Sequence, residues 1–243
     1  MKQNIYDNKT FFEKYSKMNR SVKGLEGAGE WKTLEKMLPD FRGKRVLDIG
    51  CGFGWHCQYA INHAAVSVIG IDISEKMLAV AKKKTSKKIQ YISQPIEDVI
   101  FPQSSFDVVI SSLAFHYLKS FGDIAKNVFT WLVSSGEFVF SVEHPIFTSY
   151  GTQDWYRDLS GNILHFPVDN YFHEGKREVN FLGEKVLKYH KTLTTYLNAL
   201  IQSGFEITGV VEPQPSETML KTVKGMKDEL RRPMMLIVSA RKK

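Results

Sequence analysis

The amino-acid sequence predicts an α/β fold, a doubly wound sheet of seven mostly parallel strands with an insertion after the fifth strand. Short β-branched runs alternate with stretches of helical period, which is typical of parallel strands joined by crossover helices. A glycine-rich turn follows the first of these runs. The chain has 243 residues, of which 43% are hydrophobic, so it can bury one large core and we expect a single domain over residues 1–243.

The first part of the chain supplies five strands and the helices between them. Helical patterning over residues 25–38 ends at Pro39, so residues 1–40 are expected to form a helical cover. Strands are predicted at residues 44–49, 66–71, 89–92, 106–111 and 136–142. Helices are predicted at residues 55–63, from the N-cap Ser74 onward, and at residues 124–132.

Residues 146–190 interrupt this alternation. They hold nine of the thirty aromatic residues without a sustained helical or strand period, which indicates an insertion rather than another crossover unit. Regular patterning returns with a helix whose apolar stripe begins at Leu193 and which ends at Gly204. Two closing strands are predicted at residues 205–211 and 234–240.

Charge and cysteine content argue against several classes of function. The formal net charge of +7 would suit an acidic partner, but the basic residues are dispersed. The densest cluster lies at the end of a predicted helix, where cations complement the helix dipole: Lys82, Lys83, Lys84, Lys87 and Lys88. No RNA-binding signature accompanies it, so a nucleic-acid partner is not expected. Cys51 and Cys57 have no partners at zinc spacing, so no metal site is expected.

The sequence also predicts the location of the protein. No apolar run approaches the ~18 residues of a membrane span, and residues 1–15 lack the apolar stretch of a signal peptide. We therefore expect a cytoplasmic protein that does not enter a membrane. The sequence leaves the oligomeric state open.

The stretch VLDIGCGFGW, residues 46–55, places three glycines at alternate positions after a predicted strand. Glycine permits backbone angles and close approaches that a Cβ forbids, and ligands bind at this edge of open parallel sheets. A dinucleotide-binding G-x-G-x-x-G turn does not fit, since Trp55 stands where a small residue is needed. A P-loop is excluded because no Gly-Lys-Ser/Thr follows. What remains is the pattern Asp-x-Gly-x-Gly-x-Gly, from Asp48 to Gly54.

This pattern resembles the first motif of the class I S-adenosylmethionine-dependent methyltransferases. The stretches VIGIDIS, QPIEDV and SFDVVISSLAFHYL also fall where that family would place them, and the likeness is strongest over residues 30–142. The resemblance implies a Rossmann-like methyltransferase fold with strand order 3-2-1-4-5-7-6 and an antiparallel last strand. Within the family the chain is similar to the small-molecule type, in particular to the ubiquinone/menaquinone-biosynthesis group.

The resemblance implies S-adenosyl-L-methionine as the cofactor. Asp72 would accept hydrogen bonds from both ribose hydroxyls, and Asp48 would orient the glycine turn or accept from the ammonium group of the methionine tail. Residues after the third strand would edge the adenine, although Pro95 stands where the family often has an acid. The expected cofactor-binding residues are Asp48, Gly50, Cys51, Gly52, Gly54, Asp72, Ile73, Met77, Ile96, Glu97, Ser111 and Leu113.

Methyl transfer is an in-line displacement, so the enzyme gains most by aligning the acceptor with the methyl group, and no metal is required. A base adds to the rate when the acceptor must lose a proton. The candidate bases are His116 after the fourth strand, His144 after the fifth and His190 before the later helix. Residues 146–190 are expected to cover the acceptor, with Tyr150, Trp155 and Tyr171 in contact with it.

Three classes of function remain open on the sequence. Methyl transfer to a small molecule is favoured by the aromatic insertion and by the lack of an RNA-binding module. An RNA or protein methyltransferase is supported by the net charge alone. A non-catalytic protein that binds S-adenosylmethionine is the third possibility.

Overall fold

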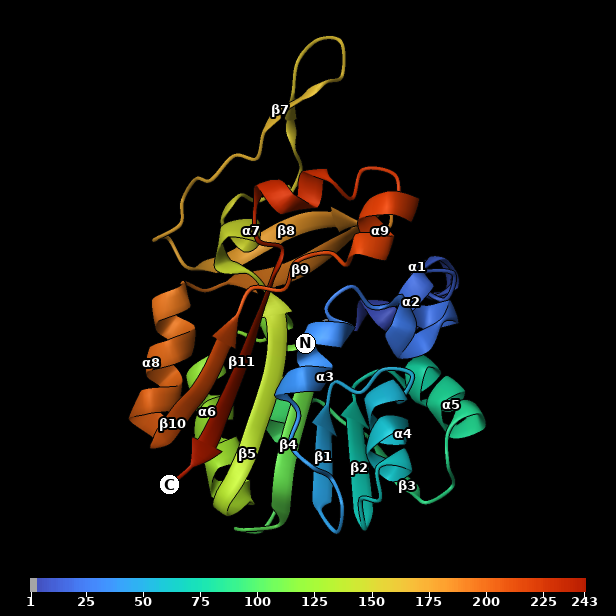
Figure 1. Ribbon diagram of the computed structural model, residues 1–243, viewed down its shortest axis with the longest axis vertical. Coiled ribbons are helices and arrows are strands. Elements are labelled where there is room, and N and C mark those ends of the chain that lie inside the picture. Colours follow the sequence, from blue (N-terminus) through green and yellow to red (C-terminus); the bar gives the residue numbers. More distant parts are fainter. Residues whose placement is uncertain (1–3) are drawn as a thin grey trace.

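One seven-stranded sheet organises the chain, and a computed structural model describes it over residues 4–243 (Figure 1). The sheet has the order β3-β2-β1-β4-β5-β11-β10. Its strands are β1 (Arg45–Ile49), β2 (Ser67–Asp72), β3 (Ile89–Ser93), β4 (Phe106–Ser112), β5 (Leu132–Glu143), β10 (Phe205–Val211) and β11 (Met235–Lys242). Neighbouring strands are parallel except that β11 runs antiparallel to both β5 and β10. The predicted order 3-2-1-4-5-7-6 is confirmed.

Helices cover both faces of the sheet because successive strand residues point to opposite sides. Val46 and Val108 pack on the face covered by α3 (Trp31–Met37), α4 (Trp55–Asn62) and α5 (Glu75–Lys84). Leu47 and Val109 pack on the opposite face, against α6 (Phe121–Trp131) and α8 (Leu193–Ser203). The predicted caps are also found: the Ser74 side chain accepts from the first turn of α5, and Gly204 ends α8 with φ of +99°.

The N-terminal segment lies over the carboxyl ends of the central strands (Figure 1). It contains α1 (Lys9–Tyr15), α2 (Asn19–Val22), α3 and the 3-10 turns Ile5–Asp7 and Gly24–Gly27; residues 1–3 of the expected cover lie outside the described residues. The helix predicted over residues 25–38 begins only at Trp31. At Gly27 a Cβ would lie 2.2 Å from the carbonyl oxygen of Asn19, so the chain is folded tightly against α2 there instead of continuing a helix.

The insertion is more regular than the sequence indicated. It contains α7 (Pro145–Ser149), the short pair β6 (Tyr156–Arg157) and β7 (Ile163–His165), and an antiparallel hairpin of β8 (Gly175–Phe181) and β9 (Glu184–His190). The expectation of no strand period was therefore wrong for residues 175–190. The reason is that the buried positions of β9 are Val186, Lys188 and His190, two of which are polar and hide the alternation.

Candidate functional site

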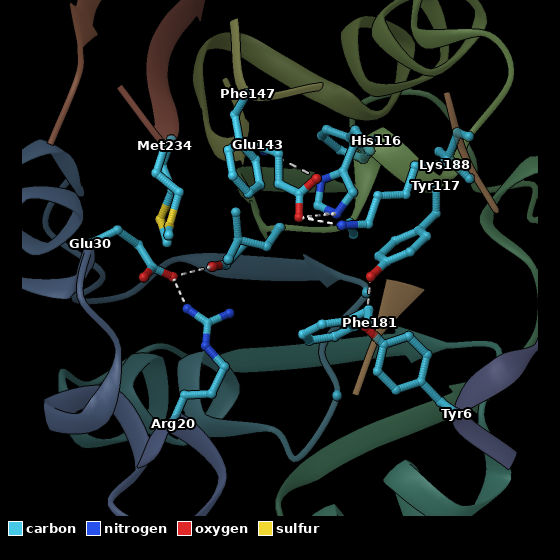
Figure 2. A pocket seen from close by; sticks show the side chains of 18 of the residues that line it. Tyr6, Arg20, Glu30, His116, Tyr117, Glu143, Phe147, Phe181, Lys188 and Met234 are labelled. Carbon is cyan, nitrogen blue, oxygen red and sulfur yellow. Dashed lines mark hydrogen bonds and ion pairs between the residues drawn. The ribbon is translucent and has the colours of Figure 1, made fainter. Parts of the chain in front are cut away.

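A cavity of about 750 Å³ opens at the carboxyl ends of β1, β2, β4 and β5 (Figure 2). Volumes of about 300–1,000 Å³ are usual for small-molecule sites. The N-terminal segment, the β8–β9 hairpin and residues 213–235 enclose it. The predicted cofactor-binding residues that line it are Gly50, Gly52, Asp72, Ile73, Met77, Ile96, Glu97 and Leu113.

The three glycines of the turn adopt left-handed backbone angles, with φ of +70°, +52° and +74° at Gly50, Gly52 and Gly54. A Cβ on Gly50 would lie 2.4 Å from the Cβ of Ala114, and one on Gly54 would lie 2.1 Å from Tyr91 Oη. Beside Gly52 the nearest atom is a methionine methyl carbon at 4.0 Å. The outer two glycines are thus required by packing within the protein, and Gly52 leaves the space for a ligand.

Asp72 ends β2 and faces the cavity with its carboxylate already held in place. The amide N–H of Gly52 donates to Oδ2 at 2.9 Å, and that of Ser74 donates to Oδ1 at 2.8 Å. Burial raises the pKa of Asp72 to about 6, although these backbone donors favour the charged form. Each carboxylate oxygen keeps a further lone pair, so Asp72 can still accept hydrogen bonds from a ligand.

Four predicted cofactor-binding residues do not line this cavity: Asp48, Cys51, Gly54 and Ser111. Asp48 is 1% exposed and lies beneath the turn, where Cys57 Sγ donates to its Oδ2 at 3.1 Å. Burial raises the pKa of Asp48 to about 7. Ser111 Oγ donates to the carbonyl oxygen of Ile49 at 2.8 Å. Asp48 and Ser111 therefore support the turn from inside the protein.

A smaller cavity of about 80 Å³ adjoins the glycine turn and shares Arg20, Glu30 and Gly52 with the large one. Three buried atoms of its lining residues have no hydrogen-bond partner within residues 4–243: Ser21 Oγ, Glu30 Oε2 and Trp55 Nε1. The other oxygen of Glu30 accepts from Arg20 at 2.5 Å. Buried polar atoms are rarely left unpaired, so this group requires a ligand or water. Sequence analysis missed it because its members come from separate elements.

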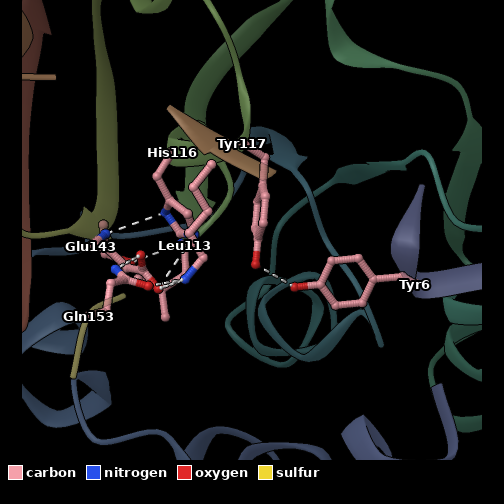
Figure 3. Close-up of polar contacts among 8 residues, drawn as sticks. Tyr6, Leu113, His116, Tyr117, Glu143 and Gln153 are labelled. Carbon is pink, nitrogen blue, oxygen red and sulfur yellow. Dashed lines mark hydrogen bonds and ion pairs between the residues drawn. The ribbon is translucent and has the colours of Figure 1, made fainter. Parts of the chain in front are cut away.

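Glu143, at the end of β5, is the centre of a polar cluster on the cavity wall (Figure 3). Lys188 Nζ donates to its Oε1 at 2.6 Å, and Gln153 Nε2 donates to its Oε2 at 2.8 Å. Lys188 also donates to Gln153 Oε1 at 2.9 Å. Burial alone would raise the pKa of Glu143, but the charge of Lys188 and the hydrogen bonds from Lys188 and Gln153 outweigh it, and the pKa is lowered. The carboxylate is therefore ionised at neutral pH.

Of the three candidate bases, His116 lines the cavity, and burial lowers its pKa to about 3. Its Nδ1 accepts from the backbone N–H of Glu143 at 3.4 Å, and its Nε2 lies 4.0 Å from Glu143 Oε1. The backbone donor assigns the proton of the neutral ring to Nε2. His116 therefore presents an N–H group toward Glu143 rather than a free lone pair toward the cavity.

His144 and His190 are buried but are not part of the cavity lining. Nδ1 of His144 accepts from Ile146 N at 3.0 Å and caps α7, while its Nε2 lies 2.8 Å from Glu212 Oε1. His190 bonds Thr148 Oγ1 through Nδ1 and a backbone carbonyl through Nε2, both at 2.8 Å. Both rings hold the insertion in place, and the geometry offers neither of them to a ligand in this cavity.

The expected substrate aromatics Tyr150, Trp155 and Tyr171 likewise lie outside the lining. Trp155 packs against Phe166 and the Arg232 guanidinium, and Tyr171 Oη accepts from Leu193 N at 3.1 Å. Other aromatics of the lining come from the N-terminal segment, the loop after β4 and the insertion: Tyr6, Tyr15, Phe115, Tyr117, Phe147, Phe181 and Tyr189. The sequence could indicate that aromatic residues gather in the insertion, but not which of them face the cavity.

Two tyrosines close one side of the cavity, where Tyr6 Oη and Tyr117 Oη lie 2.9 Å apart (Figures 2 and 3). Next to Tyr6, the Asp7 carboxylate accepts from Ser74 Oγ at 2.6 Å and from Lys76 N at 3.1 Å, at the start of α5. These contacts fix the N-terminal segment beside Asp72. This side of the cavity is thus closed by contacts among three parts of the chain that are distant in sequence: the N-terminal segment, the start of α5 and the loop after β4.

Within residues 4–243, no group of three or more His, Cys, Asp or Glu side chains is arranged to hold a metal ion. None of the helices formed by these residues is both long and apolar enough to cross a membrane.

Comparison with known proteins extends these findings. The methyltransferase domain family matches residues 47–140. The crystal structure of an S-adenosylmethionine-dependent methyltransferase from Mesorhizobium loti is 43% identical with a TM-score of 0.84, over 90% of this chain and 100% of that one. A structure from Listeria monocytogenes, proposed to be such a methyltransferase, is 56% identical with a TM-score of 0.86, over 90% and 99% of the two chains. An uncharacterized protein of Haemophilus influenzae is 35% identical over 99% of this chain and 98% of its own length.

Proposed function

The chain belongs to the class I S-adenosylmethionine-dependent methyltransferases, and on this premise we propose that it transfers a methyl group from S-adenosyl-L-methionine to a small-molecule acceptor held in the cavity. The observation that carries the proposal is the enclosure of about 750 Å³ by three separate segments of the chain. A cavity of that size is in the range usual for a cofactor and a small molecule.

The residues present fit the cofactor. Asp72 can accept from the ribose hydroxyls, and Gly52 leaves open space beside it. The small cavity suits the amino-acid tail: Glu30 Oε2 can accept from an ammonium group, while Trp55 Nε1 and Ser21 Oγ can donate to a carboxylate beside Arg20. The unpaired atoms thus match both charges of a zwitterion.

When bound, S-adenosylmethionine supplies a methyl group on a positively charged sulfur. The chain's contribution is alignment, because an in-line displacement depends chiefly on the positions of the reacting atoms. Leu113, which lines the cavity just after β4, is held at φ of +54° by bonds from its N–H to Ser141 O and Oγ. A strained residue fixed in this way supports a rigid wall at the reacting end of the site.

Labelled S-adenosylmethionine tests the proposal directly. The protein is incubated with a cell extract separated into an ultrafiltrate of small molecules, an RNA fraction and a protein fraction. In the reaction with the ultrafiltrate we expect a new labelled compound, resolved from S-adenosylmethionine by chromatography, and we expect Asp72→Ala to reduce it through weaker cofactor binding. Label confined to RNA or protein would contradict the small-molecule acceptor. Cofactor binding without label in any fraction would instead favour a non-catalytic binding protein.

A further inference from the structure

The wall of the cavity is unusually rich in methionine. Six of the seven methionines within residues 4–243 line it: Met18, Met77, Met219, Met226, Met234 and Met235. Four of them come from residues 213–235, and Phe147 and Phe181 add aromatic surface from the insertion (Figure 2). Methionine is flexible and polarizable, so such a wall adapts to apolar ligands of different shapes. The part of the cavity away from Asp72 is therefore suited to an apolar ligand.

Charged side chains interrupt this apolar wall, among them Glu143, Lys188, Asp154 and Glu229. The side chain of Glu143 is 16% exposed, whereas those of Lys188 and His116 are 3% and 2% exposed. All three residues line the cavity, and Glu143 is the most exposed of them, so a ligand meets its carboxylate most readily (Figure 2). Lys188 and Gln153 occupy one lone pair on each oxygen, which leaves the carboxylate able to accept another hydrogen bond.

The charges of this cluster cancel. The carboxylate of Glu143 is balanced by Lys188 at 2.6 Å, and His116 is neutral. The ion pairs of Arg20 with Glu30 and of Arg232 with Glu229 are balanced as well. A ligand with a net charge beside Glu143 would lose hydration without gaining an opposite charge, which is costly in a buried site.

We propose that this half of the cavity binds a neutral, largely apolar acceptor that donates one hydrogen bond, from a hydroxyl group, to Glu143. The proposal rests on the proposed function and names the chemical class of its acceptor. Glu143 selects the donor group, Lys188 and Gln153 hold the carboxylate in position, and the methionine wall receives the remainder of the molecule. Neither an anionic nor a cationic acceptor would find an unpaired opposite charge beside Glu143, because Lys188 already neutralises the carboxylate.

Three probes that share the same apolar 4-butylphenyl group but differ in charge test the proposal: 4-butylphenol, 4-butylbenzoate and 4-butylbenzylamine. Calorimetry at pH 7.5, with S-adenosylhomocysteine saturating, gives the affinity of each. We expect the neutral phenol to bind at least tenfold more tightly than the anion or the cation. Glu143→Gln should weaken phenol binding about ten- to a hundredfold, the range for a hydrogen bond to a charged group. Glu137→Gln, six residues earlier on the same strand and outside the cavity lining, should leave the affinity unchanged.

Lys188→Met adds a readout that loss of structure alone would not produce. This variant removes the positive charge that neutralises the Glu143 carboxylate. The probe bound most tightly should therefore change from the phenol to the benzylamine. If either variant fails to fold, the order of the three affinities for the parent protein still tests the proposal. Equal or tighter binding of the anion or cation, unchanged phenol affinity in Glu143→Gln, or binding of none of the probes would overturn the proposal. Failure to bind S-adenosylhomocysteine would instead count against the proposed function.

Discussion

Single residues in the small cavity separate recognition of the methionine tail from recognition of the nucleoside. Ser21 Oγ and Trp55 Nε1 are unpaired donors there, while Asp72 faces the large cavity. Trp55→Phe and Ser21→Ala should each weaken S-adenosylmethionine binding about five- to tenfold, because each removes one hydrogen bond of about 1 kcal/mol. Affinity for 5′-methylthioadenosine, which lacks the amino-acid tail, should stay the same.

Calorimetry with both ligands checks this prediction, and Ser203→Ala, on α8, is a matched control for the serine change. If both ligands lose affinity equally, the two residues support the turn in general and do not contact the tail.

Asp72 should make cofactor affinity depend on pH. Its pKa is raised to about 6 in the free protein because it is buried. Ribose hydroxyls donate to the ionised form and lower that pKa on binding, so the complex holds fewer protons than the free protein. Affinity should therefore be constant above about pH 6 and fall as the pH drops below it. Calorimetry from pH 5 to 8 measures this, and Asp72→Asn should bind more weakly with a flat profile over that range. A parent profile that is equally flat would contradict the assignment of Asp72 to the ribose.

At the scale of elements, the N-terminal segment and the β8–β9 hairpin form one closing unit. Phe11 is fully buried between them and packs against Val179, Val186 and Phe181, with the two phenyl rings 5.7 Å apart. Lys14 Nζ also donates to the carbonyl oxygen of Leu182 at 2.9 Å. The cover is therefore joined to the hairpin mainly by apolar contact.

Phe11→Ala should loosen this unit without unfolding the sheet. Truncation of a buried phenylalanine costs about 3–5 kcal/mol, and the loss falls on contacts between the two segments. Hydrogen exchange should become faster over residues 5–22 and 175–190, with little change in β1, β4 and β5. Phe12→Ala, at a half-buried neighbour, should have a smaller effect. Equal acceleration along the whole chain would mean that the cover and the core unfold together.

The sequence predicted the sheet well because parallel strands buried on both faces are continuous apolar runs with glycine and cap signals between them. It predicted the cofactor side of the site for a related reason, since Asp72 and the glycine turn are adjacent to those runs. It could not predict Glu143 with Lys188. A lysine in a strand is usually exposed, and its partner lies 45 residues away, so only the folded chain shows that both are buried together.

At the scale of the whole molecule, the distribution of charge argues against RNA as the acceptor. The net charge is +7, but the lysines at the end of α5 lie about 15 Å along the helix from Asp72, the length of ten helical residues. We expect no saturable binding of bulk tRNA at 150 mM salt in filter-binding assays. Affinity that is measurable there and falls steeply with salt would contradict this. The variant Lys82→Gln, Lys83→Gln, Lys84→Gln then reports whether the α5 cluster is responsible.

The position of β11 between β5 and β10 has a consequence for biosynthesis. β10 pairs with β11 along its length, yet β10 is translated more than twenty residues earlier. As the chain leaves the ribosome, strands β1 to β5 can already pair, whereas β10 has no strand to pair with until β11 is released. The nascent protein therefore passes through a stage in which one half of the sheet is complete and the other half still has an unpaired strand that is prone to aggregate. This is the stage at which a chaperone would be needed most.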